Sequence, residues 1–242
     1  MGRIWAIVAV MAVLVAVPAA AGEHKQVRGV VELFTSQGCN SCPPADKVLV
    51  DLVKEGDVVA LGYHVDYWDY LGWKDTLGSA EFSQRQRDYA KTFGRGTVYT
   101  PQAVINGRTH MNGGSRRSIE QALAATGLKV EVSAEKTDNS LVIKAGDGGG
   151  NLGDAHLVLV YFDETKNVKI ERGENRGRTI TYANIVTGLQ TAGMWHGDPV
   201  RYELPISEIK KRGSGGCAIL LQVVGPGGQP GAILGATILH NG

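Results

Sequence analysis

Two of the three cysteines in the chain, Cys39 and Cys42, are separated by two residues in the stretch FTSQGCNSCPPA. Three kinds of chemistry use this spacing: a disulfide that staples the fold, a metal site and a redox-active dithiol. In a redox-active dithiol the first cysteine attacks a disulfide sulfur as a thiolate, and the second resolves the mixed disulfide. These are the roles that the pattern predicts for Cys39 and Cys42.

A structural staple is a weak explanation of the pair. A disulfide stabilises a fold mainly by restricting the unfolded chain, and a loop as short as Cys39–Cys42 restricts it little. Three cysteines are also an odd number and too few for a disulfide framework. The third, Cys217, lies in an apolar run, which indicates a buried thiol and not a third redox partner.

The N-terminus predicts that the protein is exported. Arg3 precedes an apolar run at residues 4–17, and small residues lead up to Gly22, which is the layout of a signal peptide cleaved after Ala21. The run is shorter than the roughly 20 residues that span a bilayer, although an uncleaved anchor stays open as the alternative. We therefore expect a periplasmic or secreted protein, with no membrane partner after cleavage, in an oxidising compartment.

The charge of the chain is nearly balanced, with 25 basic and 24 acidic residues. The sequence has no basic stripe of the kind that binds nucleic acid, so nucleic acid is not an expected partner. We expect a monomer without a cofactor, because no segment of the sequence is typical of dimerisation. Its expected partners are protein or peptide thiols and disulfides.

The residues on either side of the cysteines predict a strand followed by a helix. Residues 27–35 (VRGVVELFT) are typical of a buried strand, and residues 45–56 (ADKVLVDLVKEG) carry apolar residues at helical spacing. Cys39 is therefore expected near a helix N-terminus, where free N–H groups and the helix dipole lower the pKa of a thiol. We expect its sulfur to be the more exposed of the two.

Further elements are predicted in the rest of the first half. Residues 57–63 are typical of a second buried strand, and residues 79–93 and 115–126 of helices. Between these two helices, Asn106-Gly107 separates two apolar-alternating runs and predicts a type I′ β-hairpin. The expected order is strand, helix, strand, helix, hairpin, helix.

This order resembles the thioredoxin fold, with Cys39 and Cys42 at a strand–helix junction and Thr100-Pro101 at the entrance to the hairpin. The stretches VELFTSQGCNSCPPAD, HVDYWDYLGWKD and YTPQAVING resemble a family of exported bacterial thioredoxin-like proteins, the domain of unknown function 1223 family. The resemblance implies a thioredoxin-like domain at residues 22–127, a central mixed sheet flanked by helices. It also implies a cis Thr100–Pro101 bond that faces the dithiol and leaves the Thr100 backbone free for a substrate peptide.

Glu32 lies in the middle of the first predicted strand, where a carboxylate is unfavourable unless it has a partner or a role. Thioredoxin-like proteins often bury an acid beneath the second cysteine as a proton acceptor, and the resemblance implies this role for Glu32. Its spacing from Cys39 is one residue longer than is usual in those proteins. A position on a polar strand face is the alternative.

An aromatic-rich segment at residues 63–73 (YHVDYWDYLGW) falls in a connection that is longer than the thioredoxin fold requires. We expect it to form one wall of a cleft over Cys39, with Tyr67, Trp68 and Trp73 as peptide contacts. A plain cover over the core is the alternative.

A metal site is the remaining use of the cysteine pair. Cys39 and Cys42, together with His64, His110 or Met111, could bind Cu(I) or zinc. Thioredoxin-like copper carriers typically have a longer spacing between their cysteines, and a structural zinc site would use a second pair. We therefore expect no metal site.

The second half, residues 128–242, predicts an all-β, sandwich-like domain, because short strand-like runs recur between Gly, Asn and Asp turns. The segment ERGENRGRT at residues 171–179 predicts a solvated hairpin tip, with a binding loop as the alternative. Nothing in this half predicts catalysis.

Three functional hypotheses follow from the sequence. The favoured one is an exported thiol–disulfide oxidoreductase that acts on protein or peptide thiols. The second is a non-catalytic binding module that keeps its disulfide static and uses the β-rich half as its working surface. The third is a periplasmic copper-handling protein.

Overall fold

The structure is a computed structural model that describes residues 27–150, 152–210 and 212–241. The predicted signal peptide, with its cleavage after Ala21, lies outside the described residues. Within these ranges no helix combines the length and the apolar character that a membrane crossing needs.

The first half of the described chain alternates strands and helices. Their bounds are β1 (Val30–Thr35), α1 (Pro43–Glu55), β2 (Val59–His64), the short 3₁₀ helix η1 (Asp69–Leu71), α2 (Ala80–Thr92), β3 (Gln102–Ile105), β4 (Thr109–Asn112) and α3 (Arg116–Ala125). This confirms the predicted order of strand, helix, strand, helix, hairpin and helix.

Local sequence signals begin and end these elements. α1 ends at Gly56, whose φ of 67° lies in the left-handed region that glycine adopts readily. Ser79 caps α2, because its side chain accepts a hydrogen bond from the Glu81 backbone N–H. Between β3 and β4, Asn106 and Gly107 both have positive φ, as a type I′ turn requires. The predicted hairpin is therefore confirmed.

The second half of the described chain consists mostly of strands, as predicted. Their bounds, with those of the helices between them, are β5 (Val132–Lys136), β6 (Ser140–Ala145), β7 (Ala155–Lys169), β8 (Thr179–Trp195), β9 (Val200–Pro205), α4 (Ile206–Lys210), β10 (Gly216–Val224), η2 (Pro226–Gly228) and β11 (Pro230–His240). The longest strands, β7 and β8, form an antiparallel hairpin in which Ala155 pairs with Trp195 and Lys169 with Thr179.

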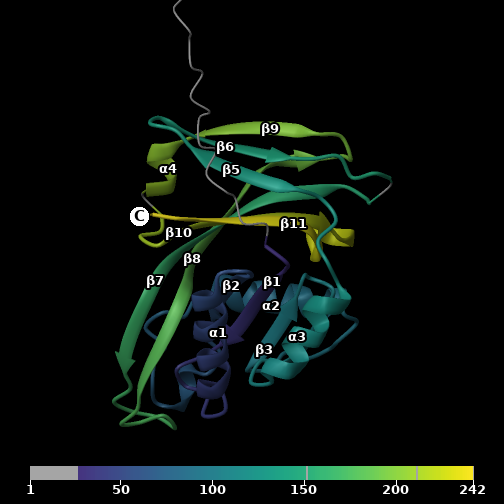
Figure 1. Cartoon of the computed structure of the whole chain (residues 1–242). Helices are drawn as coiled ribbons and strands as arrows, with labels where there is room; N and C mark the ends of the chain where they lie inside the picture. Colours follow the sequence, from purple (N-terminus) through teal and green to yellow (C-terminus); the bar gives the residue numbers. More distant parts are fainter. Residues whose placement is uncertain (1–26, 151, 211, 242) are drawn as a thin grey trace, which may run out of the picture.

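Strands of both halves share one eight-stranded sheet, in the order β11-β10-β7-β8-β2-β1-β3-β4 (Figure 1). β1 is parallel to β2 and antiparallel to β3. The two halves meet where β8 runs parallel to β2, with Ile185 opposite Gly62. The structure thus confirms an α/β fold with a mixed sheet. It does not show a separate all-β domain from residue 128, because four strands of the second half continue the same sheet.

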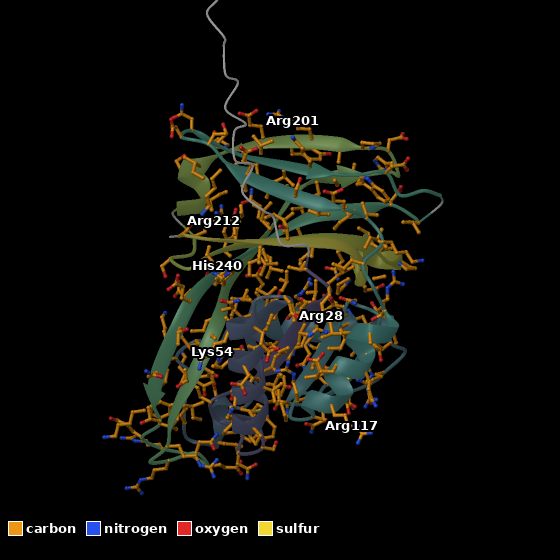
Figure 2. The ribbon with its side chains drawn as sticks, viewed as in Figure 1. Arg28, Lys54, Arg117, Arg201, Arg212 and His240 are labelled. Atoms are coloured by element: carbon orange, nitrogen blue, oxygen red, sulfur yellow. A yellow bond between two sulfur atoms is a disulfide. The ribbon has the colours of Figure 1, made fainter. Side chains whose placement is uncertain are left out.

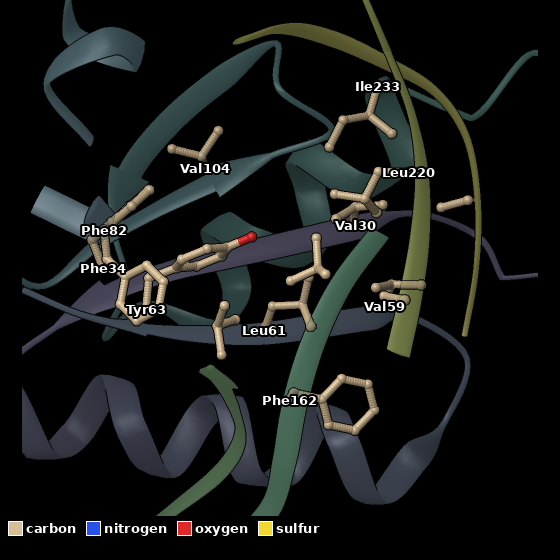
Figure 3. Close-up of a cluster of buried hydrophobic side chains, with 14 of the residues drawn as sticks. Val30, Phe34, Val59, Leu61, Tyr63, Phe82, Val104, Phe162, Leu220 and Ile233 are labelled. Carbon is tan, nitrogen blue, oxygen red and sulfur yellow. The ribbon is translucent and has the colours of Figure 1, made fainter. Parts of the chain in front are cut away.

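Helices cover both faces of the first-half strands. On one face, α1 and α3 pack on the sheet, and Leu33 and Leu49 are buried in that cluster. On the other face, α2 packs through Phe82 against Phe34. This second cluster continues into Phe162 of β7, so one core spans both halves (Figure 3).

A second sheet, with β6 between β5 and β9, packs on the β7, β10 and β11 part of the large sheet. Leu141 and Ile143 of β6 are buried there with Leu159 of β7 and Ile219 of β10. This packing is the sandwich-like part of the molecule. The other end of the β7–β8 hairpin extends away from it, beside α1, toward the bottom of the view (Figure 1). The hairpin tip thereby reaches the cysteine end of the molecule.

Candidate functional site

Cys39 and Cys42 form a disulfide between the end of β1 and the start of α1. Two tight backbone bonds shape this loop: Cys39 N–H donates to Ser36 O at 3.1 Å, and Cys42 N–H donates to Cys39 O at 3.2 Å. Cys42 is the N-cap residue of α1. The predicted position at a strand–helix junction is confirmed, and a disulfide there is compatible with an exported protein.

Cys39 is the more exposed of the two cysteines, as expected, but only by a small margin, because both are buried and neither is open to solvent. Cys39 is 2% exposed and Cys42 is 0% exposed. The second half of the chain contacts this loop, because the Asn175 side-chain amide donates to the backbone oxygens Cys39 O and Gln37 O, both at 2.9 Å. Asn175 is itself buried, although the residues on either side of it are exposed. The hairpin tip therefore covers the cysteine loop.

The hairpin tip is held in this position from two sides. Arg178 donates a hydrogen bond to the Asn175 side-chain oxygen at 2.9 Å, which orients the amide. Gly173, with a φ of 73°, approaches η1 so closely that a Cβ there would lie 3.1 Å from Trp73 Cβ. Ile170 is fully buried beneath the tip. The predicted hairpin tip is confirmed, but Asn175 is not solvated as expected.

The aromatic segment contacts the residues that lead to Cys39. Trp73 Nε1 donates to the side chain of Gln37 at 2.9 Å. Trp68 packs on Gly38, where an added Cβ would lie 3.1 Å from Trp68 Cβ. Tyr67, the third predicted contact, donates its hydroxyl hydrogen to the side-chain oxygen of Gln86 on α2. Peptide binding by Tyr67, Trp68 and Trp73 stays a prediction.

The Thr100–Pro101 peptide bond is cis, as the resemblance implies. It precedes β3, and the next residue, Gln102, lies opposite Phe34 near the end of β1. The bond is therefore at the same end of the sheet as the cysteine loop. Trp68 links the two features, because its Nε1 donates to Thr100 Oγ1 at 2.8 Å.

Glu32 does not lie beneath Cys42. Side chains alternate between the two faces of a strand, and Glu32 points to the α2 face. There it accepts hydrogen bonds from Arg85, with a closest N–O distance of 2.7 Å, and from the Tyr89 hydroxyl. The residue at the usual spacing is Leu33, which faces α1. Glu32 lies one residue before the usual position, so its carboxylate points to the α2 face and not to the α1 face. It is therefore on the wrong face of the sheet for proton transfer to Cys42.

The buried acid on the α1 side is Asp46, which the sequence reasoning did not single out. Its N–H donates to Cys42 O at 3.1 Å, so the two side chains lie on one helix face, a turn apart. Thr35 Oγ1 donates to Asp46 Oδ1 at 2.7 Å. Among the described residues, the other carboxyl oxygen is buried without a hydrogen-bond partner. The only sequence signal was a carboxylate four residues after Cys42.

Burial raises the pKa of Asp46 to about 7, since the ionised form loses its hydration, and the Thr35 bond and the nearby His64 offset this only in part. Close by, His64 Nδ1 lies 2.9 Å from Asp75 Oδ2, and both side chains are buried. Burial would also raise the pKa of Asp75. His64 and hydrogen bonds from the Gln37 and Leu77 backbones outweigh that effect and lower it.

The predicted metal-ligand candidates are not gathered around the cysteines. His64 is held by Asp75, whereas the His110 ring lies 2.9 Å from the Tyr99 hydroxyl and beside Phe93. In the ranges that the structure describes, no group of three or more His, Cys, Asp or Glu side chains could hold a metal ion.

Cys217 lies on β10 and is fully buried, as predicted. Burial raises the pKa of its thiol to about 11, because the thiolate would lose its hydration, and the charge of Lys136 opposes this shift. At neutral pH this thiol is therefore protonated and a poor nucleophile.

The family model described as "Protein of unknown function (DUF1223)" matches residues 30–222. Among solved structures, this chain is similar to the crystal structure of protein AGR_C_4864 from Agrobacterium tumefaciens. The identity is 46%, the TM-score is 0.81, and the match covers 88% of this chain and 94% of that chain. HBP35 of Porphyromonas gingivalis shares the fold alone, at 14% identity and a TM-score of 0.54, over 90% of this chain and 76% of that chain. No curated protein matches this chain.

Proposed function

We propose that this chain, which belongs to the DUF1223 family of proteins of unknown function, is an exported thiol–disulfide oxidoreductase that uses Cys39 and Cys42. The observation that carries the proposal is the Cys39–Cys42 disulfide at the start of α1, at the same end of the sheet as a cis Thr100–Pro101 bond. The strand order β2-β1-β3-β4 with α1, α2 and α3 supports a thioredoxin-like first half. Its substrates are protein or peptide thiols and disulfides.

The exchange has two steps. A substrate thiolate attacks the Cys39 sulfur, so that a mixed disulfide forms and Cys42 leaves as a thiolate. A second substrate thiolate then attacks the substrate sulfur of the mixed disulfide and releases Cys39 as a thiolate. The substrate dithiol is oxidised to a disulfide, and the Cys39–Cys42 disulfide is reduced to two thiols. The same steps in reverse reduce a substrate disulfide.

Asp46 takes the proton-transfer role that the sequence suggested for Glu32. Cys42 leaves as a buried thiolate, which is unfavourable in an apolar environment until it is protonated. Asp46 lies one helical turn away, and a carboxyl group with a pKa of about 7 holds a proton that it can donate near neutral pH. In the reverse reaction its carboxylate accepts the proton of the Cys42 thiol.

Attack on Cys39 requires the hairpin tip to move. The Asn175 side chain holds the tip on the cysteine loop through two hydrogen bonds to backbone carbonyls, and these bonds break before a substrate sulfur reaches Cys39. Neutral hydrogen bonds contribute about 0.5–1.5 kcal/mol each, so breaking the two Asn175 bonds is a modest step that does not require the buried Ile170 beneath the tip to leave the core.

Insulin reduction tests the proposal. The wild type, Cys39→Ser and the matched control Cys217→Ala are compared in the presence of dithiothreitol. We expect catalysis by the wild type and by Cys217→Ala, whose thiol lies in the core between the sheets. We expect no catalysis by Cys39→Ser, because the nucleophile is gone. Equal rates for the wild type and Cys39→Ser would contradict the proposal.

A static disulfide in a binding module is the second candidate, and the burial of both sulfurs favours it. The two candidates differ in how the folded protein responds to a reductant. In the oxidoreductase, dithiothreitol reduces Cys39–Cys42 while near-ultraviolet circular dichroism remains native. In the binding module, reduction occurs only when the protein unfolds.

A further inference from the structure

A groove of about 550 Å³ runs between α1 and the start of β8. It begins at Pro43, which directly follows Cys42, and it includes Arg178, which directly precedes β8. Figure 1 shows α1 and β8 side by side over this length. The groove therefore includes the residue next to Cys42 and the residue at the base of the hairpin tip.

The groove carries an excess of positive charge. Its charged side chains are Lys47, Lys54 and Arg178, against the single carboxylate of Asp51. Asp51 is already bound to Lys47 at 2.7 Å, and among the described residues Lys54 forms no salt bridge. The whole chain is nearly neutral, so this excess is local. Apolar surface from Val50 and Ile180 lies between the charges.

Arg178 connects the groove to the dithiol. Its guanidinium donates to the Asn175 side-chain oxygen at 2.9 Å, and the nitrogen of the same amide holds Gln37 O and Cys39 O. A carboxylate accepts a guanidinium hydrogen bond roughly twice as strongly as a neutral amide oxygen does. A carboxylate in the groove thus competes with Asn175 for Arg178, and an amide that loses Arg178 is held in place only by its two N–H bonds to Gln37 O and Cys39 O.

We propose that the groove docks an acidic peptide segment of the redox partner, and that binding of its carboxylates to Arg178 releases Asn175 and uncovers Cys39. The inference rests on the proposed oxidoreductase function and names the partner of that site. The occupant is a peptide and not a bare anion, because the cations are spread along a groove with apolar surface between them. The partner would thereby open the site that it uses.

The test uses a ten-residue peptide of alternating Glu and Leu as the probe, with the oxidised, mature wild-type protein. Binding is measured by calorimetry, and the rate of Cys39–Cys42 reduction by dithiothreitol is measured by thiol labelling and mass spectrometry. We expect saturable binding that weakens with salt and a reduction rate that rises about tenfold on binding. A six-residue oligothymidylate, whose five phosphodiesters match the five carboxylates of the peptide in charge, serves as the non-peptide probe.

Four variants, two of them controls, locate the effect. Arg178→Gln is expected to speed reduction in the absence of peptide and to gain nothing from peptide. Lys54→Gln is expected to weaken peptide binding several-fold with an unchanged basal rate. Arg176→Gln, on the same tip, and Arg117→Gln, on α3 and away from the groove (Figure 2), are the controls and should behave as the wild type. All four positions are exposed, so folding is expected to be retained.

The inference is overturned if the peptide does not bind, if it binds without changing the reduction rate, or if oligothymidylate has the same effect. These outcomes differ from a failure of the proposed function. An inactive protein in the insulin assay, with peptide-dependent reduction by dithiothreitol intact, would remove the enzymatic activity but leave the docking and its effect on Asn175 in place.

Discussion

The two faces of the central sheet both bury charged side chains, but they satisfy them differently. On the α2 face, Glu32 accepts from Arg85 and Tyr89, while Gln222 accepts from Arg85 and donates to Tyr89. Each carboxyl oxygen of Glu32 has a donor. A closed network of this kind needs no further partner and holds α2, β1 and β10 together.

On the α1 face the buried carboxylate itself is only partly satisfied, whereas on the α2 face the group without a partner among the described residues is a hydroxyl, that of Tyr63 beside Arg85. One oxygen of Asp46 and the Tyr182 hydroxyl have no hydrogen-bond partner among the described residues. The edge of the Tyr182 ring packs on His64, with 4.6 Å between the ring centres. An unsatisfied buried group destabilises a fold, so its presence one turn from a disulfide indicates a functional site. The comparison indicates that Glu32, whose two carboxyl oxygens both accept hydrogen bonds, has a structural role. Asp46, which has one oxygen without a hydrogen bond, is the candidate for proton transfer.

The largest effect is expected when the closed network is broken. Arg85→Met leaves the Glu32 carboxylate buried without its cation, which should destabilise the fold by about 5 kcal/mol. Urea unfolding measures this, with Arg87→Met on the exposed side of α2 as the control. The reduction rate of the disulfide, measured well below the unfolding midpoint, should not change. A stable Arg85→Met variant would show that the network is not structural.

The second largest effect is expected at Asp46, where substitution should change the free energy of unfolding in a way that depends on pH. Its pKa is raised in the folded state, from 3.8 to about 7, so its contribution to stability is fully present below pH 3.8 and is lost as pH rises through 7. Asp46→Asn removes this loss and should be more stable than the wild type by about 4 kcal/mol at pH 8, with little difference at pH 4.

Urea unfolding at pH 4 and pH 8 checks this result, and Asp51→Asn on the outer face of α1 is the control. In the insulin assay Asp46→Asn should be slower by about tenfold or more, within the usual range for loss of a proton-transfer group. A variant that is more stable and equally active would leave Asp46 without the proposed role.

A smaller effect is expected at the hairpin tip. Asn175→Ala removes both hydrogen bonds to the cysteine loop, and Cys39–Cys42 should be reduced by dithiothreitol about tenfold faster, with a destabilisation of about 1–3 kcal/mol because two buried carbonyls lose their donor. The control is Asn167→Ala, which removes an exposed bond to Thr181 elsewhere on the same hairpin. An unchanged rate would mean that Asn175 does not limit access to Cys39.

The smallest effect is expected at Trp68, which joins the cysteine loop to Thr100. Trp68→Phe loses the hydrogen bond to Thr100 Oγ1 but keeps most of the packing, so we expect about 1 kcal/mol of destabilisation. Tyr70→Phe in the same segment is the control, because Tyr70 is 78% exposed. Thermal unfolding of both variants measures the difference, and equal values would show that the Trp68 bond is not needed.

The sequence by itself determined the local structure of the first half. The helix cap at Ser79, the left-handed end of α1 at Gly56 and the type I′ turn at Asn106-Gly107 all depend on residues a few positions apart. The placement of Cys42 at the start of α1 follows from the same short-range rules. Signals of this kind depend only on neighbouring residues, so they can be recognised in the sequence alone.

Only the tertiary structure decided which groups meet at the dithiol. Asn175 covers Cys39 from 136 residues away along the chain. Asp46 looks in the sequence like an ordinary polar residue of an amphipathic helix, but in the fold it is 2% exposed and bonded to Thr35 of β1. Whether a carboxylate is charged or neutral, and whether a sulfur is open or covered, depends on the burial that distant segments produce, and no local pattern encodes that burial.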